Sequence, residues 1–204
     1  MKNKIAKKKT LILITVLVFA LAFTACGGAK SAEPAAEKAP QNAGGSSNGN
    51  TGTNTGALLG SFKGESLDGT EINQEIFAQN KYTLIEVWAT YCGPCIKEMP
   101  IIEKIGQKYK DKGIGVLGIV TDAQEEDFKA NMPQVELAKE ILKKEGATYP
   151  NMLIPQEIFP LMAEITGTPS AFLVDSQGNI ASKIYAGALS EKDWSDILDQ
   201  KLGL

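Results

Sequence analysis

Three apolar runs stand out in the chain beyond residue 60, at residues 82–89, 114–121 and 171–175. Uninterrupted runs of this length, rich in β-branched residues, predict strands of a sheet that is covered on both faces. A turn at residues 176–179 should join the third run to a hairpin partner at residues 180–185. The pattern therefore predicts a central sheet whose strands are interrupted by other elements.

Helical periodicity follows the first run. Beyond Cys92, apolar residues recur on one helix face as far as Tyr109; they are Ile96, Met99, Ile102, Ile105 and Tyr109 itself. Pro100 lies inside this predicted helix. Because proline lacks an N–H donor and its ring crowds the preceding turn, we expect a kink there.

Three more helices are predicted further along. One spans residues 135–145 after a charged loop, and a short one spans residues 158–165. A last amphipathic helix begins after Ser190 and ends near Leu202, with Asp193 at the spacing of a capping box. The element order is strand, helix, strand, helix, strand, strand, helix, which predicts an α/β fold.

Two small elements precede the first long strand. A hairpin with an Asp-Gly turn is predicted within residues 61–72, and a short helix at residues 74–78. The folded domain is therefore expected to occupy residues 58–204.

The extreme N-terminus is lysine-rich over residues 1–9, and an apolar run of 13 residues follows at 11–23. Such a run is too short for a comfortable membrane span but suits a signal peptide. Its end, with Ala25 before Cys26, resembles a bacterial lipoprotein signal. The resemblance implies that residues 1–25 are removed and that Cys26 becomes the lipidated N-terminus. An uncleaved membrane anchor with an idle Cys26 is the alternative.

Residues 26–57 are dominated by Gly, Ser, Asn, Thr, Ala and Pro, without periodic apolar positions. A segment of this composition buries too little surface to offset its chain entropy, so we expect a flexible linker. About 30 such residues give a root-mean-square reach of about 30 Å. Either form of the N-terminus would then hold the domain near the outer face of the bacterial cytoplasmic membrane.

Charge and composition argue against a nucleic-acid-binding protein. The chain has no His, and all 21 basic residues are Lys; five of them lie in residues 1–9. Without those five, 16 lysines remain against 24 acidic residues. An acidic protein without arginine and without a basic cluster is not expected to bind nucleic acid.

The chemistry concentrates where the first strand meets its helix, at Cys92-Gly93-Pro94-Cys95. Two thiols at this spacing can close a disulfide across one helical turn, and a helix N-terminus favours a thiolate. Pro94 suits the first turn, and Gly93 lets a partner's backbone approach closely. Half of a zinc site is the alternative, but with no His and no second CxxC pair the ligands are missing, so no metal is expected.

Residues 88–95 read WATYCGPC between a buried strand and a helix. This stretch resembles the thioredoxin superfamily, and the resemblance covers about residues 61–202. It implies a thioredoxin fold, a central mixed β-sheet flanked by helices. The N-terminal β-hairpin is then an addition, and residues 122–165 hold a central helical insertion whose role stays open. The stretch from Cys95 to Pro100 resembles the narrower TlpA/ResA-like branch of membrane-tethered thiol-disulfide oxidoreductases.

Cys92 precedes the helix and should be the more exposed thiol, so we expect it to be the nucleophile. Cys95, one turn inside, would be the resolving thiol. An inert disulfide staple is the alternative, although such a small loop constrains the chain little.

Two carboxylates accompany the thiols. Glu86 lies on the first long strand, on the face of Trp88, where ionisation is disfavoured. The superfamily places an Asp there that assists proton transfer at the second Cys. Glu98 follows Cys95 by one turn, and in the narrower branch a Glu there lines a cavity and tunes the thiols. The alternatives are a Glu86 that reaches solvent at the strand edge and a Glu98 that is an ordinary solvated helix carboxylate.

The resemblance also implies a substrate surface. Pro169 after Thr168 occupies the position of a cis-proline loop, which would expose the Thr168 backbone for pairing with an extended client segment. Trp88 and Tyr91 would supply apolar surface around the thiols, with Gly93 and Pro94 between them. A trans turn proline at the start of a strand is the alternative.

These features predict an extracytoplasmic lipoprotein that reduces disulfides in exported proteins, with no cofactor beyond the Cys92–Cys95 couple. CGPC matches the reducing members, whereas strong oxidants usually carry a His between the cysteines. The family implies an electron-donating thiol protein in the membrane, and clients that include apocytochrome c. The alternatives are a disulfide-forming oxidase, a non-enzymatic tethered binding lipoprotein, and a peroxiredoxin-type peroxidase, whose expected Pro and Thr are replaced here by Ile85 and Ala89.

Overall fold

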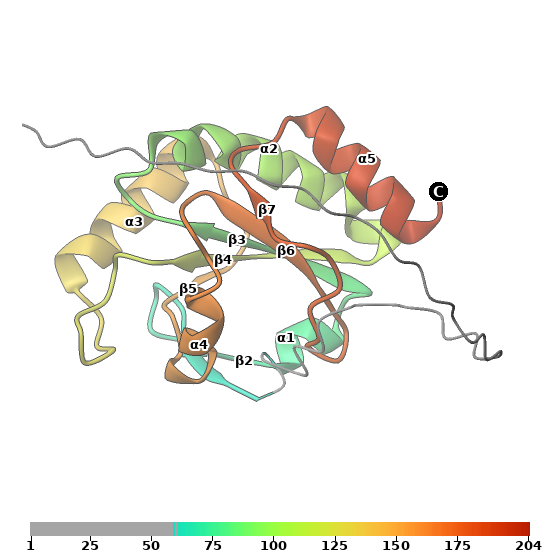
Figure 1. Cartoon of the computed structure of the whole chain (residues 1–204). Coiled ribbons are helices and arrows are strands. Elements are labelled where there is room, and N and C mark those ends of the chain that lie inside the picture. Colours follow the sequence, from blue (N-terminus) through green and yellow to red (C-terminus); the bar gives the residue numbers. More distant parts are fainter. Residues whose placement is uncertain (1–58, 60) are drawn as a thin grey trace, which may run out of the picture. The chain divides into compact units, whose positions relative to one another are not determined.

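A five-stranded mixed sheet with the strand order β5-β4-β3-β6-β7 organises the domain (Figure 1). β3 pairs in parallel with β4, and β4 with β5, whereas β6 runs antiparallel to both β3 and β7. The strands are β3 (Tyr82–Trp88), β4 (Ile114–Val120), β5 (Asn151–Met152), β6 (Ser170–Asp175) and β7 (Tyr185–Ala186). The predicted α/β fold with a central mixed sheet is confirmed.

The computed structural model describes Leu59 and residues 61–204. The predicted signal peptide at residues 1–25, the lipidation site Cys26 and the linker at residues 26–57 lie outside the described residues. Within the described range, no helix is long and apolar enough to cross a membrane.

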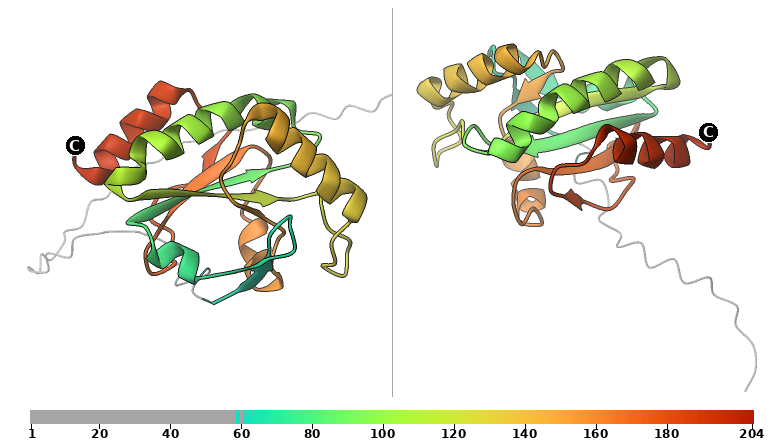
Figure 2. Two further views of the ribbon diagram at one scale, coloured as in Figure 1. Left: turned by 180° about the vertical axis from the view of Figure 1, so that it is seen from behind. Right: turned by 90° about the horizontal axis from the view of Figure 1, so that it is seen from above.

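Helices α2 (Gly93–Tyr109), α3 (Met132–Glu145) and α5 (Glu191–Leu202) cover one face of the sheet (Figure 2). The other face carries α1 (Glu75–Ala78), α4 (Phe159–Met162) and the two-stranded sheet of β1 (Lys63–Glu65) and β2 (Glu71–Asn73) (Figure 1). Two short 3₁₀ turns, η1 (Lys110–Lys112) and η2 (Gln156–Ile158), complete the elements of the described chain.

The apolar runs are explained by burial on both faces. Along β3, Ile85 and Val87 join the core under the hairpin and α4, while Leu84 and Trp88 join the two cores under α2, α3 and α5. Side chains alternate along a strand, so Glu86 belongs to the α2 face with Trp88, as predicted.

Several boundaries differ from the prediction. α3 begins at Met132, three residues earlier than expected, because Asn131 caps it by accepting a hydrogen bond from the Gln134 amide and Pro133 suits its first turn. The helix predicted at residues 158–165 is shorter: after η2 and α4, the amides of residues 163–165 donate to carbonyls three residues earlier, which is the weaker 3₁₀ pattern.

The hairpin partner predicted at residues 180–185 is largely wrong. Only a single bridge joins Ile180 to Val174, and the strand β7 begins at Tyr185. The Ser182 hydroxyl accepts the hydrogen bond of the Leu173 amide at 2.8 Å, so a side chain takes the place of the backbone acceptor that a ladder needs. By contrast, the capping box of Ser190 and Asp193 is confirmed.

Strand β5 was not predicted at all. It lies within the predicted insertion at residues 122–165, which therefore contains α3, η2, α4 and a strand. The N-terminal hairpin is confirmed, and it is bonded to this strand: the Leu67 amide donates to the Asn151 carbonyl, and the Leu153 amide donates to the Glu65 carbonyl. The added hairpin and the insertion thus form one continuous structure beside β4.

Candidate active site

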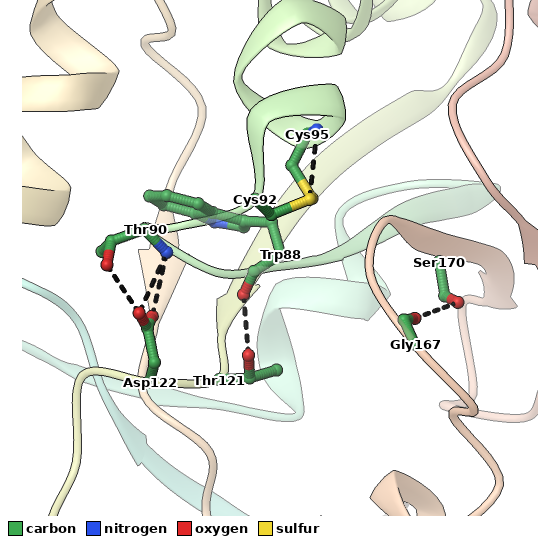
Figure 3. The surroundings of a disulfide bond; sticks show 8 residues. All are labelled: Trp88, Thr90, Cys92, Cys95, Thr121, Asp122, Gly167 and Ser170. Atoms are coloured by element: carbon green, nitrogen blue, oxygen red, sulfur yellow. Dashed lines mark hydrogen bonds between the residues drawn. A yellow bond between two sulfur atoms is a disulfide. The ribbon is translucent and has the colours of Figure 1, made fainter.

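The loop between β3 and α2 is held by residues that follow β4 (Figure 3). The Trp88 carbonyl accepts hydrogen bonds from the amide and the hydroxyl of Thr121, at 2.9 and 3.1 Å. Thr90 donates its amide (3.0 Å) and its hydroxyl (2.5 Å) to the Asp122 carboxylate, to which Gln134 of α3 also donates. These bonds fix the loop on both sides before the chain enters α2.

Cys92 and Cys95 form a disulfide with their Cα atoms 5.3 Å apart. Cys92 is the N-cap of α2, and its Sγ accepts a hydrogen bond from the Cys95 amide at 3.2 Å (Figure 3). Cys92 is 6% exposed and Cys95 is fully buried, in the predicted order. A thiolate on Cys92 would meet the free N–H groups and positive end of α2, which favour the charged form.

The surroundings of the disulfide are partly open. Tyr91 is 78% exposed, Gly93 and Pro94 are exposed, and a side chain added at Gly93 would meet nothing within 4 Å. Trp88 differs from its expected role: it belongs to the same buried cluster as both cysteines but has no exposed surface, so it is part of the core behind the disulfide and offers no surface to a client.

The peptide bond between Thr168 and Pro169 is cis, as the resemblance implied. The loop is held by the Ser170 hydroxyl, which donates to the Gly167 carbonyl at 2.7 Å (Figure 3), and by the Gly187 amide, which donates to the Pro169 carbonyl. Among the described residues, neither backbone polar group of Thr168 has a backbone partner. Within the described part of the chain, the Thr168 N–H and carbonyl, beside the start of β6, are therefore not used by another backbone group.

Glu86 is buried in the middle of the sheet, with 1% of its surface exposed. The Tyr149 hydroxyl donates to its Oε2 at 2.5 Å, while Oε1 has no partner. The pKa of Glu86 is raised to about 8, chiefly by burial; the bond from Tyr149 opposes this rise and the negative charge of Glu98 adds to it. The alternative of a solvated Glu86 is wrong, and a carboxyl in this state can take and return protons near neutral pH.

Glu98 is also buried, so the alternative of an ordinary solvated carboxylate is wrong. Its Oε1 accepts hydrogen bonds from the Leu189 amide at 2.8 Å and from the Trp194 indole at 2.9 Å. Burial raises its pKa, and both hydrogen bonds oppose that rise. Glu98 also lines a hollow of about 370 Å³ with Gly93, Pro94, Lys97, Ile101, Ala188 and Leu189. The carboxyl is thus fixed by α5 at the edge of a cavity beside the first turn of α2.

Comparison with known proteins places this geometry in a family. Residues 35–200 match the family described as Redoxin. The chain belongs to the Redoxin family. This Redoxin-family chain is 30% identical over 135 residues to the thiol:disulfide interchange protein DsbE of Haemophilus influenzae, a match that covers 66% of each chain. It is 26% identical over 132 residues to the thiol-disulfide oxidoreductase ResA of Bacillus cereus, covering 65% of this chain and 70% of that protein.

Two solved structures of thiol-disulfide exchange proteins resemble this Redoxin-family chain in fold. The thiol:disulfide interchange protein of Chlorobium tepidum TLS, a thioredoxin family protein, matches with a TM-score of 0.57 at 26% identity, over 71% of this chain and 95% of that chain. The thioredoxin domain of a thiol-disulfide oxidoreductase from Bacteroides vulgatus matches with a TM-score of 0.54, also at 26% identity, over 72% of this chain and 97% of that chain. The predicted thioredoxin fold is confirmed.

The sequence does not indicate the partners of the central side chains in this Redoxin-family site. Tyr149 bonds Glu86, and the Asn151 amide oxygen accepts the Trp88 indole N–H at 2.8 Å. The one signal was indirect: an acid inside an apolar strand requires a buried partner. Nothing in the pattern indicates that the partner lies 63 residues away. In the described part of the chain, no three His, Cys, Asp or Glu side chains gather to hold a metal ion.

Proposed function

We propose that the protein is an extracytoplasmic thiol-disulfide oxidoreductase that reduces disulfides in exported proteins. The observation that carries the proposal is the Cys92–Cys95 pair at the N-cap of α2, with exposed Tyr91, Gly93 and Pro94 around it. Relatives that are named for thiol-disulfide interchange support it.

The reaction follows from the positions of the two sulfurs. In the reduced protein, the Cys92 thiolate attacks one sulfur of a client disulfide, forms a mixed disulfide and releases the first client thiolate. The Cys95 thiolate then attacks Cys92 Sγ, breaks the mixed disulfide and releases the second client thiolate. Two electrons pass from the dithiol to the client, and the protons of the two cysteines end on the client thiols. A membrane thiol protein that donates two electrons would restore the dithiol.

Glu86 and Glu98 have different tasks in this scheme. Cys95 is fully buried, so its proton needs a nearby acceptor when it becomes a thiolate. We assign that task to Glu86, whose pKa lies near 8. The Glu98 carboxylate is held by two donors, and it would act through its charge, because a nearby negative charge disfavours a second one on sulfur.

Clients would bind over the cis-proline loop. The backbone groups of Thr168, which have no backbone partner among the described residues, can pair with an extended client segment, and exposed Tyr91 offers it apolar contact. Apocytochrome c is one client class consistent with the TlpA/ResA-like resemblance.

The N-terminal residues supply the location in this proposal. Residues 1–25 direct export, Cys26 carries the lipid and residues 26–57 tether the domain to the outer face of the cytoplasmic membrane. Mass spectrometry of the membrane fraction is expected to find a lipid-modified N-terminal Cys26 and, for Cys26→Ser, no such species. An intact Met1 with unmodified Cys26 would contradict this assignment.

The midpoint potential of the Cys92–Cys95 couple tests the direction of electron flow. A reductant is expected at about −220 to −270 mV, whereas a value of about −120 mV would indicate an oxidase. Cys95→Ser should accumulate mixed disulfides with clients, and Cys92→Ser is its matched control because it removes the same disulfide without leaving the attacking thiol. If neither variant traps a client, the non-enzymatic alternative is favoured.

A further inference from the structure

Glu86 has room in the sheet because its strand neighbours are small. It is paired across the ladder with Gly118 of β4 and Ala171 of β6, and neither has a polar side chain. The only polar group bonded to its carboxyl within the described chain is the Tyr149 hydroxyl, on the segment between α3 and β5. Its second oxygen, Oε1, is the one buried side-chain polar atom of the described residues that lacks a partner.

Tyr149 is itself anchored in place. The Asn151 side chain donates to the Tyr149 carbonyl at 3.0 Å and accepts the Trp88 indole N–H at 2.8 Å. That amide lies over Gly118, where any Cβ atom would overlap it. The same short segment therefore fixes the indole that supports the two cysteines and the hydroxyl that holds Glu86.

The groups around this pair keep the tyrosine protonated. Burial and the negative charges of Glu86, Glu103 and Glu98 raise the pKa of Tyr149 well above its usual value. Glu98 and Glu103 both come from α2, which packs on this face of the sheet, and Glu103 accepts hydrogen bonds from Thr148, next to Tyr149. Tyr149 consequently acts as a donor to Glu86 and does not compete for its proton.

We propose that Tyr149 is a positioning residue for proton exchange at the resolving cysteine: its hydroxyl occupies Oε2 of Glu86 and leaves Oε1 as the oxygen that accepts the Cys95 proton. This assignment rests on the proposed function, in which Cys95 is the resolving thiol. In the exchange, the Cys95 S–H bond breaks, the proton passes to Glu86 Oε1, and the thiolate attacks Cys92 Sγ.

The consequence of losing the hydroxyl has a defined sign. A hydrogen bond donated by a neutral tyrosine stabilises the carboxylate, so removing it raises the pKa of Glu86 above its value of about 8. Less carboxylate is then present at neutral pH, and the resolving step should slow there and recover at higher pH. Because one pKa unit changes the carboxylate fraction by about tenfold, we expect a three- to tenfold slowing at about pH 7.

The experiment uses the full chain and four variants: Tyr149→Phe, Glu86→Gln, both together, and Tyr109→Phe. Tyr109 is a matched control, because it is a buried tyrosine whose hydroxyl donates to Asp199 at 2.8 Å, on α5. Carbon-13 labelling of glutamate side chains gives the Glu86 titration directly, by NMR. The resolving step is read as the decay of the mixed disulfide that reduced protein forms with glutathione disulfide, stopped with acid and counted by mass spectrometry.

Support requires three results together. Tyr149→Phe raises the Glu86 pKa and moves the decay profile to higher pH, Tyr109→Phe does neither, and Tyr149→Phe has no effect on decay once Glu86 is Gln. The inference is overturned if the Glu86 titration is unchanged, or if it shifts while the decay profile does not. Glutathione disulfide replaces the client here, so failure to reduce exported proteins would refute the proposed function without deciding this result.

Discussion

Of the two buried carboxylates at the site, Glu98 belongs to α2 and Glu86 to β3 beneath that helix, and their surroundings are opposite. Glu98 has two donors on one oxygen, both from the beginning of α5 or the residues before it, and it borders an open hollow. Glu86 has one hydrogen-bond donor, is 1% exposed, and has one oxygen without a partner among the described residues. The first arrangement holds a charge in place, whereas the second leaves a site for a proton. Two glutamates, one on the sheet and one on the helix that covers it, thus acquire different chemistry from the number of their hydrogen-bond donors.

The largest expected effect of this difference is on stability against pH. The folded-state pKa of Glu86 lies above its unfolded value, so its contribution is complete below about pH 4.5 and is lost as the pH rises to about 8. The free energy of unfolding should fall across that window by up to about 1.4 kcal/mol per pH unit. Chemical denaturation at several pH values should show this slope for the wild type and a smaller one for Glu86→Gln. Glu98→Gln should reduce the slope less than Glu86→Gln does. Equal slopes in all three proteins would show that the two carboxyls do not differ in this way.

A second effect separates the carboxyls at a fixed pH. Glu98→Ala strips the acceptor from the buried Trp194 indole and from the Leu189 amide, so we expect a loss of about 3 kcal/mol, since buried donors left unpaired are costly. Glu86→Gln keeps an acceptor for Tyr149, so at about pH 4, where Glu86 is protonated and the first effect is absent, it should change stability by less than about 1 kcal/mol. The exposed Glu140 of α3 is the helix control: Glu140→Ala should stay within about 0.5 kcal/mol. A Glu98→Ala variant as stable as that control would show that the two donors contribute nothing.

A third, smaller effect tests the support of Glu86. Gly118→Ala would push the Asn151 amide away from Trp88 and Tyr149, and we expect overpacking to cost about 2 kcal/mol. Gly115→Ala on the same strand makes the same kind of overlap, with Asn80, and is the matched control. Both should lower the melting temperature, but only Gly118→Ala should change Trp88 fluorescence and the Glu86 titration. Identical spectra and titrations for the two variants would mean that Asn151 does not position this region.

The sequence allows the main strands, the principal helices and the disulfide loop to be predicted, because each depends on local periodicity or on a compact motif. The runs of β3 and β4 place apolar residues on both faces of the sheet, and the Ser190 capping box is complete within four residues. The predictions that were wrong or missing concern elements that depend on contacts between distant residues or that are very short. Ser182 interrupts the predicted hairpin by bonding Leu173, and β5 is too short for any pattern to indicate it.

In the candidate site, too, the functional residues could be predicted from the sequence and their partners could not. The positions of Cys92, Cys95, Glu86 and Glu98 were indicated by their distances along the chain from one motif. Their partners were not, because Tyr149 and Leu189 are brought in by tertiary packing from 63 and 91 residues away. The number of donors at each carboxyl, which decides the difference between them, is therefore visible only in the folded chain.

Strand β5 has only two residues, yet it and the residues just before it join the insertion to the buried side chains of β3. One way to test whether the insertion affects client choice is to replace residues 122–165, between β4 and β6, with the corresponding segment of a relative. Such a chimera would also remove Tyr149 and Asn151 and so replace the partners of Glu86 and Trp88. A graft that spares residues 149–152 would exchange the rest of the insertion while keeping the partners of Glu86 and Trp88.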